Sequence, residues 1–305
     1  MGLLLLFNGA AMIFSAIVSA IYKDGVTQGI TFAALLTLGI GGLVMFLTKN
    51  HQKEVKKREG YLIVTMGWLI VTVSGTMPYL VTGAIPSVTN IFFETISGYT
   101  TTGASILNDV ESLPQGLLFW RSTTHWLGGM GIIVLAIAIL PLLGIGGMQL
   151  FSAEAPGISG DKIHPRISDT AKRLWFIYVG YTVAETLLLS VAGMSLFDAI
   201  NHAMSTVSTG GFSTKNDSLT FWNDVPAIQY IIILFMFLGG ANFVLSYFAF
   251  KGRIQKVLRD EEFKWYATFL GIFLLIVVGV LWSNGSIVQS QQFPQVWGAY
   301  ESAFR

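Results

Sequence analysis

The chain has 305 residues, of which 53% are hydrophobic and only 11% are charged, and its formal net charge is +1. Soluble domains carry about 25% charged residues, so this chain has too little charge to cover a water-facing surface. It is therefore predicted to be an integral membrane protein, and its near-neutral charge argues against a nucleic-acid partner. The absence of cysteine excludes disulfides and thiolate metal sites.

Long apolar runs in the sequence predict several membrane-spanning helices. A helix needs about 20 mostly apolar residues to cross the hydrocarbon core, and continuous runs favour helices over a β-barrel, whose strands would alternate. The first two runs are joined by a short polar turn and are expected to form a helical hairpin. In chain order, the expected spans are residues 3–21, 29–47, 61–81, 117–143, 174–192, 226–250 and 265–282.

A short segment that ends in threonine and glycine stands between spans and occurs twice. Residues 92–105 read FFETISGYTTTGAS, and residues 200–213 read INHAMSTVSTGGFS. Aligning Glu94 with Asn201, 107 residues on, also places Thr102-Gly103 over Thr209-Gly210. The predicted unit is a span, a half-helix too short to cross, a threonine-glycine loop and a second span.

A second landmark supports the repeat, because an L-G-G triplet at residues 127–129 recurs at 238–240. The run at 265–282 opens a third unit, and residues 296–305 resemble the start of its half-helix, so we expect the sequence to stop before a third loop. The expected organisation is a hairpin and loop at 1–60, a first pore repeat at 61–160, a second at 161–262 and an incomplete third at 263–305.

The basic residues predict the orientation. Three loops, at 49–60, 162–173 and 251–264, hold 14 of the 18 lysines and arginines, and such loops are cytoplasmic by the positive-inside rule. The N-terminus is then cytoplasmic, and both short segments enter from the outer face. An even number of crossings separates the repeats, so they run in the same direction around an axis along the membrane normal.

The threonine-glycine loop is expected to bind a cation. Non-helical backbone at membrane depth must be buried in protein or line water, and a helix C-terminus carries partial negative charge. Threonine hydroxyls and backbone carbonyls add oxygen ligands, while Gly103 and Gly210 allow φ values that let carbonyls face one axis. Rings of carbonyls are the basis of potassium filters. The loops must converge, because one loop cannot encircle an ion.

Polar side chains near the loops are candidates for filter support. Glu94 is either a functional intramembrane carboxylate or a structural group near the start of its half-helix, and Asn201 is aligned with it. Arg121 and His125 lie one turn apart on the next span, where they are expected to contact Glu94 behind the loop. The remaining candidates flank the glycines of the two loops and are Ala104 and Gly211. Neither H-E-x-x-H nor G-x-S-x-G occurs, so an enzyme is not expected.

Five motifs resemble the bacterial Trk-type potassium uptake proteins of the Trk/Ktr/HKT superfamily, and the long second and third motifs favour the Trk branch over the Ktr branch. They are SGYTTTGAS (97–105), HWLGGMGIIVL (125–135), GGMQLFSAEAPG (146–157), DKIHPRISDTAK (161–172) and STGGFS (208–213). The resemblance implies four pore repeats around one pore and a homodimer in the bacterial inner membrane. It also implies a cytosolic TrkA-type nucleotide-binding partner and no cofactor. The filter residues that it implies are Thr101, Thr102 and Gly103, and Ser208, Thr209 and Gly210, with K⁺ held at the four hydroxyl-bearing positions.

The expected function is potassium uptake driven mainly by the membrane potential, which supplies about 2.3 kcal/mol per charge per 100 mV. The alternative is a Na⁺-permeable or Na⁺/H⁺-coupled cation transporter of the same fold. Both filters keep a glycine, at Gly103 and Gly210, and this favours K⁺. In the resembling family, serine in place of the first-repeat glycine tends to admit Na⁺.

Overall fold

The protein is all-helical in the computed structural model, which describes residues 1–49, 57–143 and 163–283. Within those ranges, five helices are long and apolar enough to cross a membrane, and one bent pair of helices meets the same criteria as a unit. The predicted all-α membrane class is confirmed. Parts of two predicted basic loops and the start of the third half-helix lie outside the described residues.

The predicted N-terminal hairpin is confirmed. It consists of α1 (Gly2–Tyr22) and α2 (Thr27–Thr48). Small residues let the two backbones approach closely, because a Cβ added to Gly41 would lie 2.9 Å from the Cβ of Leu5. The polar turn between the helices also reaches the rest of the chain, since the Asp24 carboxylate accepts a hydrogen bond of 2.7 Å from the backbone N–H of Gly116.

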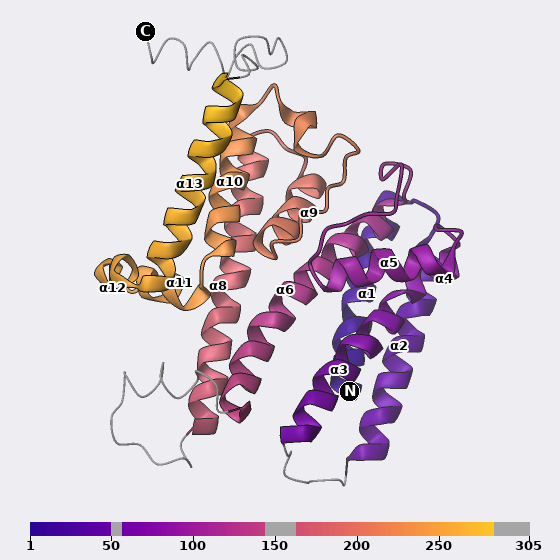
Figure 1. The fold of residues 1–305 in the computed structure, drawn as a ribbon. Helices are drawn as coiled ribbons and strands as arrows, with labels where there is room; N and C mark the ends of the chain where they lie inside the picture. The colour runs from indigo at the N-terminus through magenta and orange to yellow at the C-terminus, as the bar shows by residue number, and fades with distance from the viewer. Residues whose placement is uncertain (50–56, 144–162, 284–305) are drawn as a thin grey trace.

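Two repeats follow the hairpin. The first contains α3 (Lys57–Gly75), α4 (Met77–Thr82), α5 (Val88–Tyr99) and α6 (Gln115–Leu143). The second contains α8 (Ile163–Val191), α9 (Leu196–Val207), the 3₁₀ helix η2 (Ser218–Trp222), α10 (Pro226–Gly240) and α11 (Phe243–Phe250), and α12 (Ile254–Arg259) and α13 (Glu261–Ser283) come after it. The ends of α2 and α6 and the starts of α3 and α8 lie on one side, whereas α5 and α9 lie toward the other (Figure 1).

The half-helices α5 and α9 have the same length and the same kind of start. Each has 12 residues, or roughly 18 Å at 1.5 Å per residue, which is too short to cross. Their N-caps are Ser87 and Ser195, whose hydroxyls accept from the backbone N–H groups of Asn90 and Asp198. The first half-helix therefore begins four residues before the predicted start at residue 92.

The expected continuous span at 226–250 is wrong. The helix breaks after Gly240, and α10 and α11 meet at 107°. Ala241 has an extended backbone, and the Asn242 side chain caps α11 by accepting from the N–H of Val244 at 2.9 Å. Asn242 also donates to Glu262 at 3.0 Å, so the cap links the break to the start of α13. A composition test misses this break because apolar residues continue on both sides of it.

The main core cluster lies where the hairpin packs on the first repeat. Trp120 is fully buried, and its indole N–H donates to the carbonyl of Gly75 at 3.0 Å. Asn8 of α1 donates to the Ser74 hydroxyl at 2.7 Å and accepts from the Tyr99 hydroxyl at 2.5 Å. Because Tyr99 is the last residue of α5, the hairpin holds the half-helix at the point where the predicted filter loop begins.

Candidate functional site

The two loops leave their half-helices in the same way. In the first, Thr101 N–H bonds to Gly98 carbonyl and Thr102 N–H to Ser97 carbonyl, each at 3.0 Å. In the second, Thr209 and Gly210 repeat these bonds to Thr206 and Ser205 at 2.9 and 2.8 Å. This paired pattern is the Schellman motif, which usually has glycine at its left-handed position. Here the left-handed residues are threonines.

Left-handed backbone recurs at matching positions in both loops. The φ angles are 54° at Thr101 and 58° at Thr209, and they are 75° at Gly103 and 87° at Gly211. A positive φ is a genuine outlier for a β-branched residue, and such strain persists where the surrounding structure enforces it. The conformation of the loops is therefore duplicated together with their sequence.

The structural repeat has an offset of 108 residues, so the predicted offset of 107 is wrong by one. Val88 corresponds to Leu196 and Tyr99 to Val207. In this register TTGAS (101–105) lies over TGGFS (209–213), and Gly211, not Gly210, matches Gly103. The helix ends and the left-handed positions set the register. The predicted alignment instead paired Glu94 with Asn201 and Thr102-Gly103 with Thr209-Gly210.

The two loops touch. A Cβ added to Gly103 would lie 1.9 Å from the carbonyl oxygen of Gly210, so the loops approach as closely as backbone allows. Thr102 and Thr209 are exposed, as are the neighbouring candidates Ala104 and Gly211.

Two of the predicted filter residues, Ser208 and Gly210, are buried. Ser208 is 3% exposed, and its hydroxyl donates to the Ser205 carbonyl at 3.0 Å. Gly210 is also buried, because its backbone faces the ring of His125. The structure thus brings the predicted filter residues of the two repeats together.

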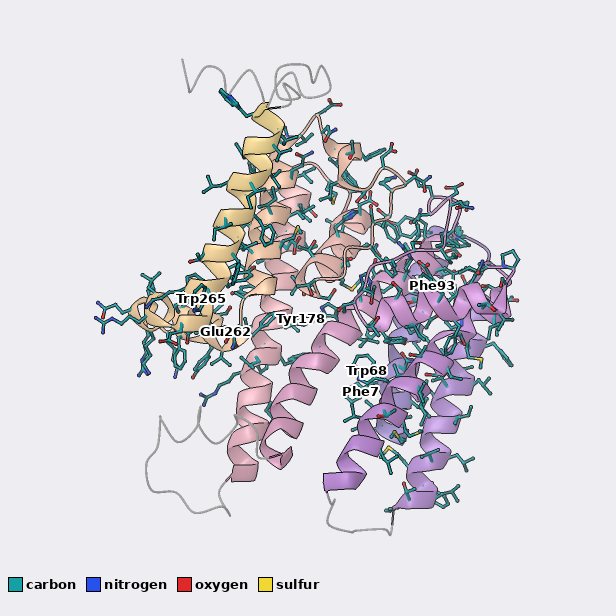
Figure 2. The ribbon with its side chains drawn as sticks, viewed as in Figure 1. Phe7, Trp68, Phe93, Tyr178, Glu262 and Trp265 are labelled. Atoms are coloured by element: carbon teal, nitrogen blue, oxygen red, sulfur yellow. The ribbon has the colours of Figure 1, made fainter. Side chains whose placement is uncertain are left out.

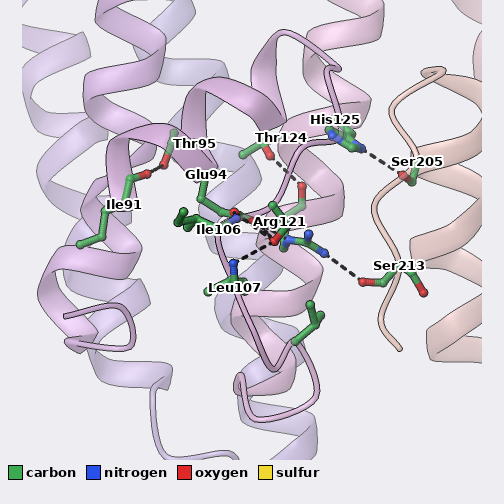
Figure 3. A network of polar contacts seen from close by, with 12 residues as sticks. Ile91, Glu94, Thr95, Ile106, Leu107, Arg121, Thr124, His125, Ser205 and Ser213 are labelled. Carbon is green, nitrogen blue, oxygen red and sulfur yellow. Dashed lines mark hydrogen bonds and ion pairs between the residues drawn. The ribbon is translucent and has the colours of Figure 1, made fainter. Parts of the chain in front are cut away.

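Glu94 is a buried anchor behind the first loop. Its carboxylate forms an ion pair of 2.6 Å with Arg121, and both side chains are almost fully buried. It also accepts from the Ser105 hydroxyl at 3.1 and 3.2 Å and from the N–H of Ile106 at 2.9 Å (Figure 3). The expected contact between Glu94 and Arg121 is confirmed. The residues just after the first loop, Ser105 and Ile106, thus bind the same carboxylate as Arg121.

The expected contact between His125 and Glu94 is not formed, because the His125 ring points into the second repeat. The ring stacks on Phe212 with 3.8 Å between centroids, and Nδ1 lies 3.0 Å from the Ser205 hydroxyl (Figure 3). Arg121 also reaches the second repeat. Its Nη1 donates to the Ser213 carbonyl at 2.9 Å, and its guanidinium lies 3.5 Å from the centroid of Phe212.

The second repeat supports its loop differently. His202 takes the place of Glu94 in the 108-residue register, and its ring nitrogens lie 2.8 Å from the Asp198 carbonyl and 3.1 Å from the Ser213 hydroxyl. Asn201 instead donates to the Phe197 carbonyl within its own helix at 2.7 Å. The predicted equivalence of Glu94 and Asn201 is therefore corrected to Glu94 and His202.

The L-G-G triplets have the same packing role in both repeats. A Cβ on Gly128 would lie 2.0 Å from the Tyr99 carbonyl oxygen, and one on Gly239 would lie 3.1 Å from that of Val207. The first glycine of each triplet thus makes room for the last residue of its half-helix. Small residues at these positions allow the helix and the end of the half-helix to approach closely.

The residue before each triplet also accepts a hydrogen bond from a tyrosine of the next repeat. The hydroxyl of Tyr178 on α8 donates to the Trp126 carbonyl at 2.9 Å, and that of Tyr266 on α13 donates to the Phe237 carbonyl at 3.1 Å. Figure 2 shows Tyr178 where α8 approaches α6. The accepting residue precedes the triplet in both cases, so α13 docks on the second repeat as α8 docks on the first.

Sequence reasoning missed the residues that join one loop to the other. Phe212 is 3% exposed and lies against both Arg121 and His125. Asn216 accepts from the N–H of Val110 at 2.7 Å and donates to Asp109 at 2.8 Å. The shared threonine, glycine and serine of TTGAS and TGGFS would have given the correct register. No pattern in the sequence marks the contacts between repeats.

Two repeats that run in the same direction, each with a half-helix and an irregular loop between spans, define a pore-loop membrane protein. The profile of the TrkH family, described as a cation transport protein, matches residues 26–288. The chain belongs to this family.

Named relatives agree with that assignment. The chain is 42% identical over 306 residues to the Trk system potassium uptake protein TrkH of Escherichia coli strain K12, covering 97% of this chain and 62% of the relative. It is 36% identical over 283 residues to TrkG of the same strain, covering 92% of this chain and 57% of TrkG. The crystal structure of the potassium transporter TrkH from Vibrio parahaemolyticus matches with a TM-score of 0.84 at 36% identity. That match covers 96% of this chain and 59% of the transporter. The chain thus spans about three fifths of the length of these relatives.

Proposed function

We propose that this chain supplies two of the filter loops of a potassium uptake pathway in the bacterial inner membrane. One observation carries the proposal: the strips 101–103 and 209–211 share an unusual left-handed conformation and meet at Gly103 and Gly210. A single loop cannot surround an ion, so convergence of duplicated loops is what an ion filter requires.

The chemistry follows from the backbone. The C-termini of α5 and α9 lead directly into the loops, and each places partial negative charge near the meeting point. Left-handed residues alternate with residues of negative φ, as at Thr101, Thr102 and Gly103. This alternation turns successive carbonyls toward one side, where they replace the hydration shell of K⁺. The proposed ligands include the oxygens of Thr101, Thr102 and Thr209 and the carbonyl oxygen of Ser208, whose buried hydroxyl donates to the Ser205 carbonyl.

The assembly around these loops is part of the proposal. Two loops form half of a four-fold ring, and the rest of the ring belongs to two further repeats. The proposed units are 1–60, 61–160, 161–262 and the start of a third repeat at 263–305. The native form is a homodimer with a cytosolic TrkA-type nucleotide-binding subunit.

The orientation and the driving force are also part of the proposal. The N-terminus faces the cytoplasm, as the basic loops indicate, and the membrane potential drives cation entry.

The test is ⁸⁶Rb⁺ flux into proteoliposomes that contain the full-length protein, with Na⁺ and Li⁺ as competitors. We expect flux that responds to an imposed negative-inside potential and is inhibited by K⁺ far more strongly than by Na⁺. Equal inhibition by Na⁺ would replace the proposal with Na⁺-permeable transport in the same fold. Absence of potential-driven flux would refute transport by this pathway.

A further inference from the structure

Three side chains make a contact between the repeats that we call the inter-repeat clamp: Arg121 and His125 of α6, and Phe212 after the second loop. The guanidinium carbon of Arg121 lies 3.5 Å from the centroid of Phe212. The ring of His125 stacks on the same ring at 3.8 Å and 12°. Two groups this close to one centroid cannot share a face, so the Phe212 ring lies between them.

The clamp holds the second loop at both ends. Before the loop, His125 Nδ1 lies 3.0 Å from the Ser205 hydroxyl, and the Ser205 carbonyl accepts from the N–H of Gly210 at 2.8 Å. After the loop, Arg121 donates to the Ser213 carbonyl at 2.9 Å. Residues 209–211, which carry the proposed ligands, lie between these two attachments.

The clamp also restricts the second loop sterically. A Cβ added to Gly210 would lie 2.1 Å from His125 Nδ1 and 2.4 Å from Cε1. The absence of a side chain at Gly210 is therefore required by a residue 85 positions earlier in the chain. Gly210 does not have a positive φ, so the contact with His125, and not backbone conformation, excludes a larger residue.

The same ion pair anchors both loops. Glu94 orients Arg121 through the 2.6 Å contact and also binds Ser105 and Ile106 just after the first loop. The clamp is not repeated on α10. At the 111-residue offset of the L-G-G triplets, Arg121 corresponds to Ile232 and His125 to Met236, and neither can form these polar contacts. Helix α10 thus lacks the two polar side chains with which α6 forms the clamp.

We propose that Arg121 and His125 are positioning residues that set the cation preference of the second-repeat filter from within the first repeat. This inference rests on the proposed potassium pathway. Neither residue is among the proposed ligands. They hold the backbone of residues 209–211 so that its carbonyls stay at the spacing set by the first loop. Loosening the clamp should therefore change which cation is preferred, and not only how much protein folds.

The experiment uses the full-length protein in proteoliposomes and measures the ratio of ⁸⁶Rb⁺ inhibition by K⁺ and by Na⁺. We expect Gly210→Ala to lower the K⁺ preference about tenfold, which corresponds to ~1.4 kcal/mol of lost discrimination. His125→Ala should lower it several-fold. The double variant should be no worse than His125→Ala alone, because the ring that opposes the new methyl group is gone.

Arg121→Lys is the second variant, because it keeps the charge beside Glu94 but lacks the planar fork that reaches Ser213 and Phe212. We expect it to fold and to lose several-fold in K⁺ preference. Thr123→Val is the matched control on the same helix, since the Thr123 hydroxyl bonds only to the Phe119 carbonyl at 2.7 Å. The control should keep the wild-type ratio.

Two results would overturn the inference. One is a wild-type ratio of inhibition by K⁺ and by Na⁺ in folded Arg121→Lys and His125→Ala proteins. This result would show that the clamp contributes only to packing and not to cation preference. The other is a double variant whose loss equals the product of the single losses, because independent sites multiply in this way. A wild-type protein without K⁺ preference would instead refute the proposed function, so the two failures are distinguishable.

Discussion

The sharpest prediction concerns Gly103→Ala. A Cβ at this position would lie 1.9 Å from the Gly210 carbonyl oxygen, whereas ordinary contacts begin at 3.4 Å. The loops would have to separate by about 1.5 Å, a distance comparable to a covalent bond. Left-handed backbone adds a cost of about 1–2 kcal/mol for any residue with a Cβ, because φ at Gly103 is 75°. We expect the K⁺/Na⁺ preference to fall at least about tenfold, or ~1.4 kcal/mol.

Two other glycines separate the steric effect from the backbone effect. Gly211, the true counterpart of Gly103, has φ 87°, and Gly83 has φ 67°, and neither has an atom within 4 Å of an added Cβ. Gly83→Ala should lower thermal stability but keep the wild-type ⁸⁶Rb⁺ competition ratio. Gly211→Ala should change the ratio less than Gly103→Ala does. Wild-type preference in a folded Gly103→Ala protein would refute the proposal that the contact between the loops sets selectivity.

Three further substitutions test the supports of the loops. Glu94→Gln leaves the charge of Arg121 buried without its partner, so we expect a loss of about 3–5 kcal/mol, seen as poor recovery of folded protein by size-exclusion chromatography. Wild-type recovery would contradict the burial of this pair. Asn8→Leu leaves the buried hydroxyl of Tyr99 without an acceptor and should cost about 1–3 kcal/mol, measured as a lower Tm in detergent. Tyr178→Phe removes one hydrogen bond at the surface between repeats and should cost only about 0.5–1.5 kcal/mol; a larger drop in Tm than for Asn8→Leu would reverse the expected ranking.

Composition and motif spacing were enough to predict the membrane class, the hairpin and the duplicated unit. Helical spans follow from composition, because the bilayer requires long apolar runs with internally satisfied backbone. The L-G-G triplets supported the repeat as well, because the same three residues recur in the helix after each loop. The threonine-glycine loops stood out because the same kind of segment occurs twice, each time between a half-helix and a span.

The alignment of the two loops, and the contacts that hold them, depend on how the helices pack and could not be predicted from the sequence. The one-residue error in register arose because Glu94 and Asn201 are both polar, whereas the true counterpart, His202, makes its contact with Ser213 through folded geometry. The break at Ala241 depends on a cap by Asn242 and not on composition. The clamp on Phe212 joins α6 to a loop some 90 residues further on. The clamp leaves no periodic signal, because it is made once by side chains that meet only after the helices have packed.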